Sequence, residues 1–230
     1  MQVRVGSVRG RVILAVMLAA ALGGCAQSTD AGAKASGSPS SGSAGAKSAA
    51  TASGGTVGPS GSACELPVSF DIAKRWKAKG IDAEKELSKS SKGSDGDVTG
   101  ALADAFLRQG PVTTACEIDA KPAGKIGFLR VWTGKPGDAD ARTVLRQFVA
   151  AEDNTSKEKY RSFKTATGVS GVEVEYVYTS KLLEETKEER ALAVSTAQGP
   201  VVLHLGGMDT AEHHAMLPAY ELAKQTLRIL

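Results

Sequence analysis

Apolar and polar residues alternate over much of the second half of the chain, and this alternation predicts β-strands. Val172, Val174, Tyr176 and Tyr178 occupy every second position and would share one face of a strand. The predicted strands are Val68–Trp76, Ala115–Ala120, Lys125–Thr133, Gly171–Thr179, Arg190–Ala197 and Pro200–Leu205. The second and third of these would form a hairpin, because proline and glycine lie in the four residues between them.

A period of about 3.6 residues predicts helices over Asp97–Gln109 and Asp138–Glu152. A third helix is predicted to begin at Asp209, which stands three residues before a glutamate as in a capping box, and Pro218 is expected to kink it. The polar segment Lys77–Asp97 predicts a loop. Strands joined by short turns and flanked by helices predict an α+β fold built on an antiparallel β-sheet.

A separate apolar segment lies near the start of the chain. Val12–Leu22 has eleven uncharged residues and follows Arg4, Arg9 and Arg11, an arrangement typical of a signal peptide. A membrane-spanning helix needs about 20 apolar residues, so this segment is too short to remain in the membrane as a helix. Residues 1–24 are therefore predicted to direct export and to be removed.

Cys25 is the candidate attachment point. The sequence Leu22-Gly23-Gly24-Cys25 resembles a bacterial lipobox, in which the cysteine receives a diacylglyceryl group. Two or more acyl chains, such as palmitate, hold a protein stably at a membrane. The resemblance implies anchoring to membrane lipid through Cys25, on the extracytoplasmic side of the cell membrane. Ordinary signal cleavage after the alanine run is the alternative, and it would leave Cys25 as a spare thiol.

The charge and the cysteine content restrict the class of protein further. The chain carries 28 basic and 25 acidic residues, and removal of residues 1–24 takes away three arginines and no acidic residue, so the mature chain has no net charge. A chain without a basic excess is not expected to bind nucleic acid. Once Cys25 is assigned to lipid, Cys64 and Cys116 remain, and an even pair in an exported chain predicts a disulfide. Two reduced, buried thiols are the alternative.

Residues 25–63 consist largely of Ala, Gly, Ser and Thr, and Val57 is the only large aliphatic residue among them. Such a segment cannot bury enough apolar surface to offset the entropy of ordering, so it is predicted to be a disordered tether. Residues 64–230 have the length of one domain and are predicted to form a single monomeric α+β domain.

Two stretches of this domain resemble the Mog1/PsbP-like family, and in particular the LpqN-type lipoproteins of actinobacteria. The first is Pro67-x-x-Phe70-Asp71 with Trp76, and the second is VVLHLGGMD followed by HAMLPAYELAKQTLRIL. The resemblance covers residues 64–230. It implies a domain that catalyses no reaction and that binds other proteins or accompanies larger assemblies.

Four aromatic residues of the predicted sheet are the candidate lining of a ligand pocket between the sheet and the helices. They are Phe128, Trp132, Tyr176 and Tyr178. A lipid or another small molecule would be the ligand. The competing interpretation is that large aromatic side chains such as Trp132 fill the core.

The histidines do not indicate a metal site. His213 and His214 are neighbours on a helix, so their side chains point about 100° apart and are poorly placed to share one metal ion. His204 alternates with leucines and is interpreted as a core or edge residue of a strand. Asp95–Gly100 imitates half of an EF-hand, but Phe106 stands where that loop needs a glutamate.

The acidic run between two predicted strands has two interpretations. Glu184, Glu185, Glu188 and Glu189 would be a carboxylate site or, in the favoured interpretation, a solvated hairpin tip. The chain has no nucleophile elbow, phosphate-binding loop or dinucleotide fingerprint. No enzymatic activity, metal or cofactor is therefore expected.

The leading hypothesis is a non-catalytic binding or accessory lipoprotein of the cell envelope, with an envelope protein, glycan or lipid as its partner. The second hypothesis is a carrier that holds a lipid or small molecule. The third is a hydrolase, which requires a cleft where His204 or a histidine of the last helix meets a carboxylate.

Overall fold

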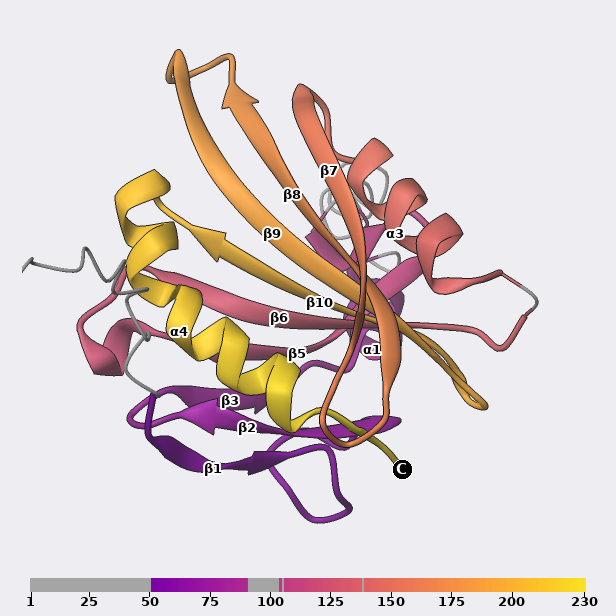
Figure 1. Ribbon diagram of the computed structural model, residues 1–230. Helices are drawn as coiled ribbons and strands as arrows, with labels where there is room; N and C mark the ends of the chain where they lie inside the picture. Colours follow the sequence, from indigo (N-terminus) through magenta and orange to yellow (C-terminus); the bar gives the residue numbers. More distant parts are fainter. Residues whose placement is uncertain (1–50, 91–103, 105, 138) are drawn as a thin grey trace, which may run out of the picture. The chain divides into compact units, whose positions relative to one another are not determined.

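The structure is a computed structural model that describes residues 51–90, 104, 106–137 and 139–230 (Figure 1). These residues belong to one compact unit of the chain, Ala46–Leu230. The predicted signal segment, Cys25, residues 26–50 of the predicted tether and Asp95–Gly100 lie outside the described residues. Within the described part, every helix is too short or too polar to cross a membrane.

Eight strands form one antiparallel sheet with the order β3-β5-β6-β10-β9-β8-β7, and β4 pairs with β5. The strands are β3 (Lys77–Gly80), β4 (Arg108–Gln109), β5 (Val112–Asp119), β6 (Gly127–Gly134), β7 (Thr155–Lys164), β8 (Ser170–Ser180), β9 (Glu185–Thr196) and β10 (Gly199–Gly207). β5 and β6 are the predicted hairpin, which turns through a short 3-10 helix at Lys121–Ala123.

A second, smaller sheet has the order β1-β2-β11. Its strands are β1 (Ser53–Val57), β2 (Val68–Ala73) and β11 (Arg228–Ile229). The assignment of residues 51–63 to a disordered tether is therefore wrong. β1 has little apolar surface, but it pairs with β2, and Val57 lies opposite Phe70 and is buried. Backbone hydrogen bonds to a distant strand thus order a segment whose composition predicts disorder.

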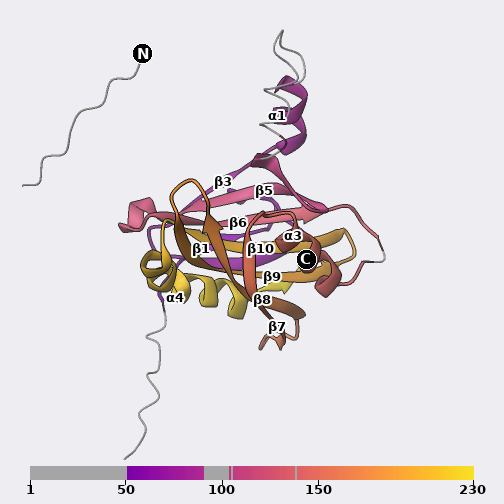
Figure 2. The ribbon, with the colours of Figure 1, turned by 90° about the horizontal axis from the view of Figure 1, so that it is seen from above.

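In the described part of the chain, three helices flank the large sheet: α1 (Ala83–Ser90), α3 (Ala141–Ala150) and α4 (Thr210–Thr226). α4 and the small sheet cover one face, α3 covers part of the other, and α1 stands beside β3 and β5 (Figure 2). Side chains alternate between the two faces, so Leu203 and Leu205 of β10 pack in the α4-side core, and Val202 packs in the α3-side core. The predicted α+β fold with an antiparallel sheet is confirmed.

Helix α4 begins as predicted, because the Asp209 carboxylate accepts a hydrogen bond of 2.8 Å from the N–H of Glu212. Pro218 lies inside the helix, which continues past it to Thr226. The predicted start of α3 is wrong by two residues: the cap is Asp140, which accepts from the N–H of Thr143, and not Asp138. Both aspartates have a side chain that suits a cap, so residue type alone does not choose between them.

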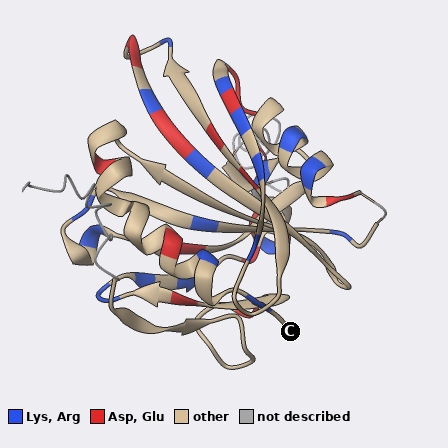
Figure 3. Ribbon diagram, in the orientation of Figure 1, with Lys and Arg blue, Asp and Glu red and all other residues tan. Residues whose placement is uncertain are grey.

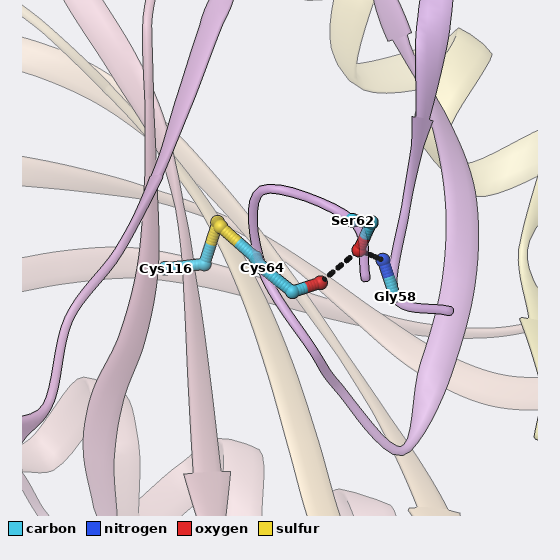
Figure 4. The surroundings of a disulfide bond; sticks show 4 residues. All are labelled: Gly58, Ser62, Cys64 and Cys116. Carbon is cyan, nitrogen blue, oxygen red and sulfur yellow. Dashed lines mark hydrogen bonds between the residues drawn. A yellow bond between two sulfur atoms is a disulfide. The ribbon is translucent and has the colours of Figure 1, made fainter. Parts of the chain in front are cut away.

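The predicted disulfide between Cys64 and Cys116 is present, with the two Cα atoms 5.8 Å apart (Figure 4). Cys64 lies in the loop between β1 and β2, and Cys116 lies in β5, so the bond links the small sheet to the large one. Beside it, the Ser62 hydroxyl accepts from the N–H of Gly58 and donates to the Cys64 carbonyl. Gly58 has a φ of +111°, which glycine adopts readily.

Three other expectations differ from the structure. The predicted loop Lys77–Asp97 contains β3 and α1, and Arg108–Gln109 pairs with β5 instead of ending a helix. The strand β7, Thr155–Lys164, has no counterpart in the sequence-based assignment. β3 and β7 lie at opposite edges of the large sheet, and β4 lies beside β5 on the same edge as β3. Edge strands are largely solvated and therefore lack the apolar pattern on which the prediction relied.

Candidate functional site

The four aromatic residues predicted to line one pocket lie in different surroundings. Trp132 and Tyr176 are buried in the core between the large sheet and α3. The Trp132 ring meets Phe148 edge to face, with ring centroids 5.5 Å apart. Phe128 and Tyr178 are half-buried. Trp132 and Tyr176 therefore fill the core instead of lining a pocket together with Phe128 and Tyr178.

Five polar side chains meet on the α3 side of the large sheet and form what we call the buried cluster. They are Glu152 after α3, Tyr176 of β8, Lys187 and Glu189 of β9, and His204 of β10. One oxygen of Glu189 lies 2.5 Å from the Lys187 ammonium, and the other lies 2.6 Å from Nε2 of His204. The Tyr176 hydroxyl lies 2.8 Å from a Glu152 oxygen and 3.0 Å from a Glu189 oxygen.

The strand register brings these groups together. Tyr176 lies directly opposite Glu189, and His204 lies opposite Ala191, so all of them project from one face. Glu184, Glu185 and Glu188 are exposed as predicted, whereas Glu189 is 2% exposed and its assignment to a solvated tip is wrong. The alternation of side chains along the strand would have identified Glu189 as buried, because it lies two residues before the buried Ala191 and four before the buried Ala193 and therefore shares their face.

The hydroxyl of Tyr176 carries one proton, yet two carboxylates lie within hydrogen-bond distance of it. When it donates to one of them, the other needs a different donor or must itself be protonated. Glu189 has two further donors, the Lys187 ammonium and His204. The geometry therefore favours an ionised Glu189 and a Tyr176 hydroxyl that donates to Glu152.

The electrostatics agree with this arrangement. Burial, together with the nearby Glu189 charge, raises the pKa of Glu152. Burial also acts to raise the pKa of Glu189, but His204 and Lys187 outweigh it and lower that pKa to about 2. Burial and the two carboxylates raise the pKa of Tyr176. Two neighbouring carboxyl groups thus hold protons with very different affinity.

A histidine beside a carboxylate is the contact that the hydrolase hypothesis requires, but His204 and Glu189 are only 7% and 2% exposed. A substrate in solution does not reach this contact. His213 is also buried, and burial and the nearby Arg190 lower its pKa to about 4. His214 meets Glu188 at 2.8 Å on the surface. The described part of the chain contains no group of His, Cys, Asp or Glu placed to hold a metal ion.

A pocket of about 290 Å³ lies between the tip of the β8–β9 hairpin and the segment that joins β10 to α4. Tyr178, Leu183, Lys187 and Met208 contribute to its lining. The Lys187 ammonium lies 5.3 Å from the centre of the Tyr178 ring and donates to the carbonyl of Gly207. Lys187 therefore belongs to both the pocket lining and the buried cluster, and its ion pair with Glu189 fixes the position of its ammonium group.

Four large apolar side chains surround this pocket or lie next to it, and we call them the apolar end. They are Ile126, Leu182, Leu183 and Met208, and they are 49%, 91%, 67% and 61% exposed. The N–H of Met208 donates to the carbonyl of Ile126, which places these two side by side, and Leu183 and Met208 both line the pocket. Grouped apolar residues in solvent mark surfaces that bind proteins, membranes or ligands.

Comparison with known proteins identifies a family but no activity. Residues 34–227 match the model of a family described as uncharacterised lipoprotein. No curated protein matches the chain. Among solved structures, the chain is similar to the solution structure of cyanobacterial PsbP (CyanoP) from Synechocystis sp. PCC 6803, with 10% identity, coverage of 82% of this chain and 98% of that one, and a TM-score of 0.47.

Proposed function

We propose that this chain, which belongs to the family of uncharacterised lipoproteins, is a lipid-anchored accessory protein of the cell envelope that binds a partner protein on the extracytoplasmic side. The family supports a lipoprotein, and the disulfide supports an oxidising compartment. The proposal includes no reaction, because the histidine–carboxylate pair in the core is only 7% and 2% exposed and the pair of His214 with Glu188 is a solvated surface contact.

The observation that carries the proposal is the apolar end. The β8–β9 hairpin projects beyond the neighbouring strands (Figure 1), and Leu182 at its turn is 91% exposed. Burial of a leucine side chain contributes about 1.5–3 kcal/mol, so two adjacent exposed leucines form an effective anchor for a complementary apolar surface. The acidic Glu184 and Glu185 beside them would form part of the polar rim of such an interface.

Replacing Leu182 and Leu183 together by glutamate is expected to reduce partner capture by about tenfold or more, because the anchor then carries charge. Recovery of cross-linked protein from envelope extract, with the purified chain as bait, measures the effect. The unfolding midpoint should not change, because both side chains are largely exposed.

Ile229 and Leu230 provide a matched control, since they are an adjacent apolar pair with exposures of 48% and 56% near the C-terminus. Their double replacement by glutamate should leave capture unchanged. Equal loss in both variants, or full capture by the hairpin variant, would contradict a binding role for the apolar end.

A small-molecule carrier is the second candidate, and the pocket at the apolar end is the observation that favours it. Its volume of about 290 Å³ lies at the lower limit of ligand sites, which commonly hold about 300–1,000 Å³. Tyr178 and Lys187 would supply an aromatic wall and a hydrogen-bond donor. Native mass spectrometry of the purified chain distinguishes the candidates, because a carrier retains a small ligand and an accessory protein does not.

Anchoring has its own test. Replacing Cys25 by alanine removes the predicted attachment point, so the chain is expected to move from the membrane fraction into the soluble extracytoplasmic fraction or the medium. Quantitative immunoblotting of the fractions measures the shift. Retention of the variant at the membrane would show that Cys25 does not anchor the chain.

A further inference from the structure

Four cationic side chains follow one another where β2 leads into β3, and we call them the basic turn: Lys74, Arg75, Lys77 and Lys79. All four are exposed, and none forms an ion pair with another described residue. Figure 3 shows this stretch as blue segments along β3 and before it. In a mature chain without net charge, this is a local excess of positive charge.

Two carboxylates face the basic turn from the neighbouring strand β5. Asp119 lies opposite Lys77, and Glu117 lies opposite Lys79. Glu117 already forms an ion pair with Arg130, with an N–O distance of 2.7 Å. Asp119 accepts a hydrogen bond from the backbone N–H of Lys121. Lys74, Lys77 and Lys79 are therefore exposed without an ion pair to a described residue. The Arg75 guanidinium makes one hydrogen bond of 3.4 Å, to the carbonyl of Ala123, and its remaining N–H donors can contact an external anion.

The protein holds the basic turn in a defined shape. Trp76 lies in the middle of the turn and is buried, and its backbone N–H donates to the carbonyl of Ala73 at 3.0 Å. Arg75 adopts a φ of +72°, a conformation that long side chains adopt infrequently. Lysines on an edge strand such as β3 also prevent pairing with other sheets. That explanation does not account for Lys74 and Arg75, which precede the strand.

The basic turn lies close to the point where the described chain begins, and this position indicates which surface it contacts. The backbone N–H of Lys74 donates to the carbonyl of Ala52 at 2.9 Å, so the turn lies beside the beginning of the described chain. Ala52 is 27 positions after Cys25. A chain of that length spans at most about 90 Å when fully extended. If Cys25 is held in a membrane, the basic turn is on the part of the domain nearest to the anchor along the chain.

We propose that the basic turn binds the phosphate headgroups of anionic lipids in the membrane that holds Cys25. Ammonium and guanidinium groups are the usual ligands of phosphate, and a membrane surface presents many phosphates at once. Anchoring keeps the domain at a high local concentration, so individually weak contacts suffice to orient it. The assignment to lipid rests on the proposed anchoring.

The test uses the chain with Cys25→Ala, so that acylation does not contribute to binding. Sedimentation with vesicles of phosphatidylcholine containing roughly one third phosphatidylglycerol is compared with sedimentation with pure phosphatidylcholine. Binding is expected only to the anionic vesicles, and it should disappear at about 1 M salt, where the Debye length is about 3 Å. Replacing all four cations of the basic turn by glutamine should weaken binding by about tenfold or more.

The matched control lies on β7, at the opposite edge of the sheet, together with a neighbouring helix. Lys157, Lys159, Lys164 and Arg146 of α3 are also exposed and without an ion pair to a described residue. Their replacement by glutamine removes the same charge and should leave vesicle binding within about twofold.

Three outcomes overturn the proposal. In the first, the parent chain does not bind anionic vesicles. In the second, both sets of substitutions weaken binding equally. In the third, the chain binds soluble polyphosphate but not vesicles. None of these outcomes tests anchoring or partner capture, which the fractionation of the Cys25 variant and the hairpin variant measure separately.

Discussion

Replacing Glu189 by alanine is expected to lower the free energy of unfolding by about 3–5 kcal/mol. The substitution removes the carboxylate that pairs with the half-buried Lys187 ammonium and hydrogen-bonds to the buried His204, and it leaves both side chains without that partner. Urea denaturation of wild type and variant at neutral pH measures the difference through the midpoint. A loss below about 1 kcal/mol would contradict the interpretation of the cluster as tightly coupled.

The adjacent Glu188 is a matched control. It has the same side chain and also meets a histidine, but its side chain is 53% exposed. Surface ion pairs contribute about 0–1 kcal/mol, so Glu188→Ala should have little effect. Glu189→Gln keeps the size of the side chain and removes its charge, which separates the loss of packing from the loss of charge.

The stability difference between wild type and Glu189→Ala should also depend on pH. Because the folded protein holds the pKa of Glu189 at about 2, below its usual 4.5, the ionised form stabilises the folded state. This stabilisation is complete above about pH 5 and is lost as the pH falls toward 2. The difference in stability between wild type and Glu189→Ala should therefore shrink over this range. Glu152 contributes with the opposite sign, because the Glu189 charge helps to raise its pKa and that influence is absent from Glu189→Ala, so Glu152→Gln is introduced into both proteins before the comparison.

Replacing Cys64 and Cys116 together by alanine is expected to destabilise the domain by roughly 4 kcal/mol, because the disulfide closes a loop with a sequence separation of 52 residues. Both cysteines are buried, so the double substitution also avoids a free thiol in the core. Thermal unfolding of the variant, and of the parent with and without a reducing agent, measures the effect. An unchanged midpoint in both experiments would contradict a stabilising role.

The disulfide links the small sheet to β5, so its loss should be felt unevenly. Hydrogen exchange is expected to accelerate more in β1 and β2 than in α3, which packs on the opposite face of the large sheet. Uniform acceleration throughout the domain would indicate that the bond acts on global stability alone.

Much of the fold was predictable because its central elements carry a strong local pattern. β8 and β10 alternate or are apolar throughout, and α4 has a recognisable cap at Asp209. The disulfide followed from counting cysteines in an exported chain. The edge strands β3 and β7 were missed because solvent-exposed strands have no apolar period. β1 was missed because its order comes from hydrogen bonds to β2 and from the burial of Val57.

The candidate site was less predictable than the fold. The aromatic residues Trp132 and Tyr176 were identified, but their role in the core depends on the position of α3 above them. Glu189 was assigned to a solvated tip, because it lies within a run of charged residues that extends to Arg190. The exposure of Leu182 and Leu183 depends on how far the hairpin extends past its neighbours. Local pattern does not contain this information.

Residue types and their spacing were sufficient to predict the pairing of Cys64 with Cys116 and the α+β class, which the structure confirms, and they also predict the lipobox at Cys25. Each depends on residue type and short-range spacing, which a sequence displays directly. Tertiary structure alone decided that Glu189 is buried, that the apolar end is exposed and that the basic turn lies beside Ala52. These depend on strand register and on contacts between residues far apart in the chain, where small shifts in pairing exchange buried and exposed positions.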